Sequence, residues 1–260
     1  MQVRDLSIDA VPLTVDTLGT LAGHLEEALD EFAAWGLAVQ ANGRLPRIHQ
    51  LLVQTFEAGQ YPKDDDELIE VGSAVQVAQE FVEIANTLPD SPIASVKEDL
   101  RIALRGTTAW RPVNKAHLQR QSQLWVGAMM VQGGAPTGVL QRTTGPNPDF
   151  ELEEGSMKYA VEVKRPESIA NAQALVSGAA KQIRNGRYHG GSIVVDLTDC
   201  IDIPLACAVD SGEPDSSALN KELTSALRDL HRQIFDDSAS RLRQRRDHVF
   251  SLVGFARHVF

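Results

Sequence analysis

A short run of alternating side chains between positions 149 and 164 says more about this fold than any other part of the chain. Phe150–Glu153 alternates apolar and polar residues, as a half-buried strand does. Glu154-Gly155-Ser156 is a turn signal, and Met157–Lys164 alternates again. We therefore predict a β-hairpin that closes near Gly155.

The two faces of the second predicted strand differ in chemistry. Successive side chains of a strand point to opposite faces, so one face is apolar and aromatic while Glu162 and Lys164 share the other. Asp149 stands at the start of the first strand, and a hairpin closed near Gly155 folds it back towards Glu162. Two carboxylates and one ammonium group then converge at one end of a small sheet.

This trio has a chemical logic. Two carboxylates on rigid strands suit a hard, oxygen-binding cation such as Mg²⁺, and the carbonyl of Val163 between them adds a ligand. Such a cation polarises a phosphoryl oxygen and lowers the pKa of a bound water. A lysine beside it orients or deprotonates the attacking water. The alternative is a solvated, mutually paired strand face, which is the commoner role of Glu and Lys on an isolated strand.

Pro148-Asp149 and Glu162-Val163-Lys164, with the two acids thirteen positions apart, resemble the PD-(D/E)XK signature of the restriction-endonuclease-like nuclease superfamily. The resemblance covers roughly residues 114–205 and includes a predicted helix on each side of the hairpin and a later apolar strand. It implies that Asp149 and Glu162 bind Mg²⁺ or Mn²⁺. It also implies that Lys164 serves the hydrolytic water.

The resemblance points to further positions on the flanking helices. In that family a helix before the hairpin often supplies another acid, but the predicted helix over 115–132 has none, and Gln123 is the nearest equivalent. A neutral glutamine would hold a second metal ion less well; alternatively, Gln123 is a surface or capping residue. On the helix predicted over 169–184, Lys181 and Gln182 are supporting candidates, or else part of a solvated last turn.

Several arginines are candidate phosphate contacts. Arg165 follows the motif lysine directly. A second group lies near the end of a helix predicted over 218–246 and consists of Arg241, Arg243, Arg245 and Arg246. Basic side chains bind phosphates through charge, although this second group equally well balances an acidic face.

The charge of the chain is divided unequally. The net charge is −10, which by itself argues against a nucleic-acid partner. Residues 1–110, however, hold 7 Lys and Arg against 18 Asp and Glu, whereas residues 111–260 hold 18 against 17. The acidity belongs to the first part, so the part with the motif remains compatible with nucleic acid.

Helical periodicity dominates the first part of the chain. Apolar spacing predicts four helices, over 15–40, 46–58, 65–88 and 94–104. We predict an acidic all-helical domain over residues 1–110 and a nuclease-like α/β domain over residues 111–260. The second domain is expected to be a mixed central β-sheet flanked by helices, a restriction-endonuclease-like core.

Other classes of protein are disfavoured. The two cysteines, Cys200 and Cys207, lack metal-ligand spacing, and no paired histidine motif or glycine-rich phosphate loop is present. No apolar run is long enough to span a membrane, and the first residues lack the apolar segment of a signal peptide. We therefore expect a cytoplasmic protein with no membrane partner.

The lead function is a Mg²⁺- or Mn²⁺-dependent endonuclease that hydrolyses phosphodiester bonds, with DNA as the favoured nucleic acid. The alternative is a catalytically weak or inactive protein with the same fold. Such a protein would act as a binding or regulatory module through the acidic helical domain, which is also the expected surface for a homodimer or a protein partner.

Overall fold

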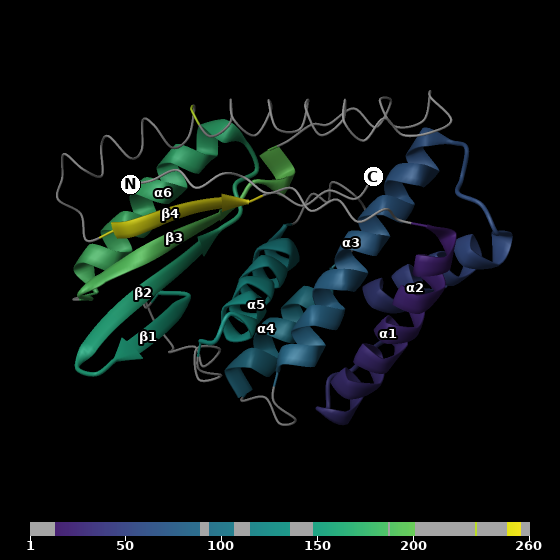
Figure 1. Cartoon of the computed structure of the whole chain (residues 1–260), viewed down its shortest axis with the longest axis horizontal. Coiled ribbons are helices and arrows are strands. Elements are labelled where there is room, and N and C mark those ends of the chain that lie inside the picture. The colour runs from purple at the N-terminus through teal and green to yellow at the C-terminus, as the bar shows by residue number, and fades with distance from the viewer. Residues whose placement is uncertain are drawn as a thin grey trace.

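The computed structural model describes residues 14–88, 94–106, 115–135, 148–186, 188–200, 232 and 249–255. Within these ranges the chain forms six α-helices and one four-stranded mixed sheet (Figure 1). The predicted mixed α/β class is therefore confirmed. A strand predicted at 138–142, the helix predicted over 218–246 and its four arginines lie outside the described residues.

The first part of the described chain forms four helices: α1 (Val15–Ala34), α2 (Arg44–Ala58), α3 (Asp65–Thr87) and α4 (Ala94–Leu104). Their starts follow from local chemistry. The Thr14 side chain accepts a hydrogen bond from the Thr17 amide at the start of α1, and Asp64 accepts from two amides at the start of α3. The acidic run at 64–67 is thus a helix start, as its sequence indicates.

Helix α1 ends earlier than its apolar periodicity predicts. The spacing predicts an end at about residue 40, whereas the last helical residue is Ala34. Gly36 has a φ of 77°, a left-handed conformation that glycine adopts readily, and the amide of Leu37 bonds back to the carbonyl of Phe32. Leu37 is still buried, so its apolar character reflects the core and not a longer helix.

The second half supplies the sheet and two helices: α5 (Ala116–Gln132), β1 (Phe150–Glu154), β2 (Met157–Lys164), α6 (Ile169–Asn185), β3 (Gly190–Asp196) and β4 (Val249–Phe255). The strand order is β1-β2-β3-β4, with β1 antiparallel to β2 and the other neighbours parallel. The predicted hairpin is confirmed: Phe150 pairs with Val161, and Gly155 in the turn has a φ of 63°.

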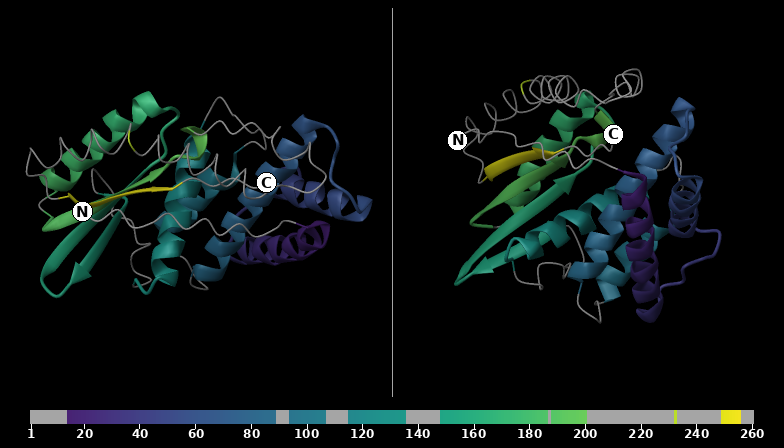
Figure 2. Two further views of the ribbon diagram at one scale, coloured as in Figure 1. Left: turned by 45° about the horizontal axis from the view of Figure 1, so that its top comes forward. Right: turned by 45° about the vertical axis from the view of Figure 1, so that its right-hand side comes forward.

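The sheet separates two apolar cores. Ala160, Ile193 and Val195 pack with α6 on one face, whereas Val161 and Val163 join the core of the helices on the other. Figures 1 and 2 show α6 and α5 on opposite sides of the sheet, with α1 to α4 beyond α5. The predicted alternation of faces along β2 is therefore confirmed.

The larger core runs without interruption from the first helices to the sheet. It includes Leu18 and Phe81 of the helical part together with Leu124 of α5 and Phe150 of β1. The predicted division near residue 110 stays a prediction, but the helical part packs directly on α5 and therefore helps to position it. None of the helices in the described ranges has the length and apolar character needed to cross a bilayer.

Candidate active site at the end of the hairpin

The structure brings the motif residues together at the end of β2. The Lys164 ammonium lies 2.5 Å from Oε2 of Glu162 and 3.7 Å from Oδ2 of Asp149. Their side chains are largely buried, with exposed fractions of 17% for Lys164, 12% for Asp149 and 1% for Glu162. The cluster is thus a shielded arrangement of two acids around one cationic group, not a solvated strand face.

Asp149 is held by the backbone of β2 and by α5. Asp149 immediately precedes Phe150, the first paired residue of β1, and its Oδ2 accepts a hydrogen bond from the Val163 amide at 2.7 Å. Its Oδ1 accepts from Nε2 of Gln123, also at 2.7 Å. Gln123 is buried, so it is neither a surface nor a capping glutamine. It lies beside Asp149, and its predicted equivalence to the helix acid of the resembled family stays a prediction.

Glu162 has the least satisfied environment of the three. Its Oε1 is buried and has no hydrogen-bond partner in the part of the chain that the structure describes, while Oε2 bonds to Lys164. Burial raises the pKa of the Glu162 carboxyl above its usual value; Lys164 opposes this rise and Asp149 adds to it. A buried carboxylate oxygen without a partner is destabilising, and it is a ready ligand for a cation.

These residues fit a single hard divalent cation. The carboxylates of Asp149 and Glu162 both approach the Lys164 ammonium, which offsets part of their negative charge, and Oε1 of Glu162 is buried with no hydrogen-bond partner among the described residues. Among the described residues, no group of three or more His, Cys, Asp or Glu side chains is placed to hold a metal ion.

The Val163 carbonyl, the third predicted ligand, already accepts one hydrogen bond. Nε2 of Gln119 donates to it at 2.9 Å, and Oε1 of Gln119 accepts from the Arg165 amide at 3.0 Å. Gln119 therefore completes the edge of β2 where β1 no longer pairs with it. A carbonyl oxygen has a second lone pair, so this bond leaves room for one more interaction.

A chain of polar contacts supports Gln123 from behind. Nη1 of Arg120 donates to Oε1 of Gln123 at 2.9 Å, and Nε of Arg120 lies 3.4 Å from Oδ1 of Asp99 on α4. The helical part thus orients the amide that contacts Asp149. The sequence did not reveal the roles of Gln119 and Arg120, because no local pattern connects α5 to the edge of a distant strand.

The other predicted site residues are placed less closely. Lys181 and Gln182 are exposed near the end of α6, and no contact recorded for the described residues joins either side chain to the motif residues. Arg241, Arg243, Arg245 and Arg246 lie outside the described residues. Their predicted roles therefore stay predictions.

Arg165 belongs to a separate buried network. Its Nη2 and Nε bond to the two carboxylate oxygens of Asp199, and its Nη1 lies 3.3 Å from Oδ2 of Asp196. The same Asp196 oxygen accepts from Ser122 of α5, and its other oxygen accepts from Thr198. The guanidinium therefore ties the ends of β2 and β3 to α5, which argues against a free phosphate contact.

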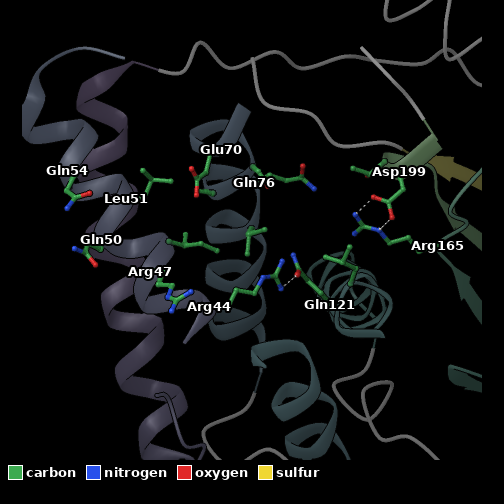
Figure 3. Close-up of a pocket in the computed structure, with 16 residues that line it drawn as sticks. Arg44, Arg47, Gln50, Leu51, Gln54, Glu70, Gln76, Gln121, Arg165 and Asp199 are labelled. Carbon is green, nitrogen blue, oxygen red and sulfur yellow. Dashed lines mark hydrogen bonds and ion pairs between the residues drawn. The ribbon is translucent and has the colours of Figure 1, made fainter. Parts of the chain in front are cut away.

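A polar cleft of about 360 Å³ lies between α2, α3 and α5. At its base, Nη1 of Arg44 donates to Gln121 at 2.6 Å, and Gln121 donates to Glu80 at 2.6 Å. Gln76 donates to the other oxygen of Glu80. Figure 3 shows Arg44 extending from the start of α2 towards Gln121, with the Arg165–Asp199 pair across the cleft.

No family model, curated protein or solved structure matches this chain.

Proposed function

We propose that this chain is a metal-dependent nuclease of the PD-(D/E)XK class that hydrolyses phosphodiester bonds in nucleic acid, with DNA as the favoured substrate. The observation that supports this most is the buried, unpartnered Oε1 of Glu162 beside Asp149 and Lys164. The order of elements, with α5, the β1–β2 hairpin, α6 and β3 in succession, is also the order expected of a restriction-endonuclease-like core.

Each motif residue has a role that its surroundings support. Asp149 and Glu162 would hold Mg²⁺ or Mn²⁺, which when bound supplies charge stabilisation at a phosphoryl oxygen and a more acidic water. Ligation requires the deprotonated form of Glu162, so a bound cation would have to displace the proton that the raised pKa of this carboxyl favours. Lys164 lies within reach of both carboxylates and would orient the attacking water and offset negative charge.

Gln123 would act as a positioning residue. It holds Oδ1 of Asp149 without adding charge, because an amide is neutral. A site with two carboxylates and an amide favours one cation over two. We therefore propose one-metal hydrolysis, in which Arg120 and Gln119 keep the surrounding backbone and side chains in place.

The acidic helical part would contribute in two ways. Two-strand cutting would favour a homodimer, whose interface would lie on this part of the chain. The helical part also repels nucleic acid through its net negative charge, and this would direct the substrate towards the sheet.

One observation favours a second candidate function, a non-catalytic binding or regulatory module with the same fold. Both oxygens of Asp149 and the carbonyl of Val163 already accept hydrogen bonds, and Gln123 stands where the resembled family often has an acid. In such a protein these contacts would serve stability, and the acidic helical part would bind a protein partner.

A cleavage assay separates the two candidates. Circular duplex DNA, linear duplex DNA, single-stranded DNA and RNA are each incubated with Mg²⁺, with Mn²⁺ and with chelator. The enzyme proposal predicts metal-dependent cleavage that disappears in Asp149→Ala, Glu162→Ala and Lys164→Ala. Full activity in any of these three folded variants would remove the proposed mechanism, and no cleavage by folded wild type would favour the binding module.

A further inference from the structure

A second cleft, of about 310 Å³, shares Arg44 and Arg47 with the larger cleft. The loop between α1 and α2, the first turn of α2 and the end of α4 form its walls. Four arginines line it: Arg44, Arg47, Arg101 and Arg105. None of the described residues that line it is acidic, whereas the larger cleft includes Glu70 and Asp199.

This concentration of positive charge stands out against its surroundings. Residues 1–110 hold 7 Lys and Arg against 18 Asp and Glu, so more than half of their basic side chains gather at one cleft. Arg101 also contacts Glu98 at 3.0 Å on the outer surface. Arg47 and Arg105 are exposed, and no acid among the described residues is recorded within ion-pair distance of either.

Backbone donors add to this charge. Helix α2 begins at Arg44 after Gly43, and no side chain caps its first turn. The amides of a first helical turn lack intrahelical acceptors, and the helix dipole favours an anion there. Pro46 removes one of these amides, which leaves the amides of Arg44 and Leu45 next to the arginine side chains.

Arg44 provides an independent observation. Its side chain is buried, with 4% of the residue exposed, and its Nε has no hydrogen-bond partner among the described residues. Burial lowers the pKa of the guanidinium to about 10, and the charge of Glu80 opposes that shift only in part. A buried donor without an acceptor is destabilising unless a ligand or water accepts from it.

We propose that this cleft binds the phosphate groups of a small phosphorylated ligand of the size of a nucleoside diphosphate. Arg47 and Arg105 bind the phosphate oxygens from the open side, and the start of α2 and Arg44 bind them from within. Leu37, Val39 and Leu104 give the remaining wall an apolar surface for the organic part of the ligand. The larger cleft is a weaker candidate, because its Arg165 already pairs with Asp196 and Asp199.

Calorimetric titration with ADP and with inorganic phosphate tests this inference. The titrations contain a chelator, so that the proposed metal site takes no part. Wild type is compared with the double variant Arg47→Gln/Arg105→Gln, with Arg184→Gln as an exposed control on α6, and with Lys164→Ala. We expect saturable ADP binding that weakens at least about tenfold in the double variant and is unchanged in the other two, a difference of about 1.4 kcal/mol.

Two results would overturn the inference. One is the absence of saturable binding of ADP and phosphate to wild type, or equal binding by wild type and the double variant. The other is binding of a short single-stranded oligonucleotide to wild type, lost in the Arg47→Gln/Arg105→Gln variant, when neither ADP nor phosphate binds. If Lys164→Ala loses cleavage but still binds ADP, ligand binding at this cleft does not depend on the proposed nuclease site. The two proposals can then be tested separately.

Discussion

Two buried charge clusters lie at the same end of β2, and they differ in how completely their atoms are paired. In the first, Arg165 donates from all three of its nitrogens to Asp196, Asp199 and Ser122. In the second, Lys164 joins Asp149 and Glu162, but Oε1 of Glu162 has no partner. The first cluster lies on the α5 side of the sheet, and the carboxyl of Glu162 is on the α6 side by strand alternation.

The difference separates a structural role from a functional one. A fully paired buried network rigidifies the fold, because every desolvated charge finds a partner. An unpaired buried oxygen destabilises the protein by about 1–3 kcal/mol, so its presence in a shielded site calls for another explanation. We infer that the Arg165 cluster holds the strand ends to α5, whereas the Glu162 cluster is completed by a cation.

The largest expected effect is on stability, from Arg165→Met. This change leaves Asp196 and Asp199 buried without their cationic partner, and breaking a buried pair in this way typically destabilises by about 3–5 kcal/mol. Urea denaturation measures the loss. The control is Arg184→Met on the exposed surface of α6, for which we expect a change within about 0.5 kcal/mol. Equal stabilities of the two variants would contradict the structural role of Arg165.

A smaller effect, on the affinity for metal, is expected from Gln123→Glu. This change adds a third acid to the cluster of Asp149, Glu162 and Lys164. Nε2 of Gln123 lies 2.7 Å from Oδ1 of Asp149, so a glutamate there would add charge at the proposed cation site. We expect Mn²⁺ to bind about tenfold more tightly, a gain of about 1.4 kcal/mol. Without metal, the variant should unfold at a lower temperature than wild type.

The matched control for this change is Gln123→Ala. It removes the hydrogen bond to Asp149 without adding a carboxylate, so it should not strengthen Mn²⁺ binding. If Gln123→Glu and Gln123→Ala bind Mn²⁺ equally, the position is not close enough to the cation to act as a ligand.

The smallest expected effect is a pH dependence from Glu162. Its pKa is raised in the folded protein above the usual 4.5, mainly by burial, so the folded state favours the protonated form. The resulting stability is fully present below pH 4.5 and is lost as the pH rises through the raised folded pKa. The effect is confined to this one carboxyl, so we expect it to be smaller than the loss caused by breaking the Arg165 cluster.

The measurement compares wild type with Glu162→Gln in chelator. The glutamine resembles the protonated acid at every pH, so the two proteins should have similar free energies of unfolding in acid. Wild type should become less stable than the variant as the pH rises above 4.5. Stability curves that run parallel from acid to neutral pH would show that Glu162 has the same pKa in the folded and unfolded protein.

Local patterns in the sequence were sufficient for most of the secondary structure. The hairpin was predictable because its strands alternate and Gly155 marks the turn, and the helices were predictable from apolar spacing and from start signals such as Thr14 and Asp64. The convergence of Asp149, Glu162 and Lys164 followed from the same alternation. Where periodicity misled, at the end of α1, the buried Leu37 imitated one more helical turn.

Contacts between distant elements were not predictable in this way. Gln119 caps the edge of β2 from α5, and Arg165 pairs with acids more than 30 positions away. Neither residue has a local signature, because an amide or guanidinium looks the same in sequence whether it is solvated or buried. The second cleft is likewise lined by arginines from α2 and from the end of α4, and only the packing of these segments brings the side chains together.

The most direct test of the central inference is a titration of Mn²⁺ followed by electron paramagnetic resonance, which counts bound ions without requiring a substrate. Wild type is compared with Glu162→Gln, which keeps the shape of the side chain and removes its charge. The account predicts one ion per wild-type chain and binding weakened at least about tenfold in the variant, equivalent to about 1.4 kcal/mol. Equal Mn²⁺ binding by the two proteins, or no saturable binding by wild type, would contradict it.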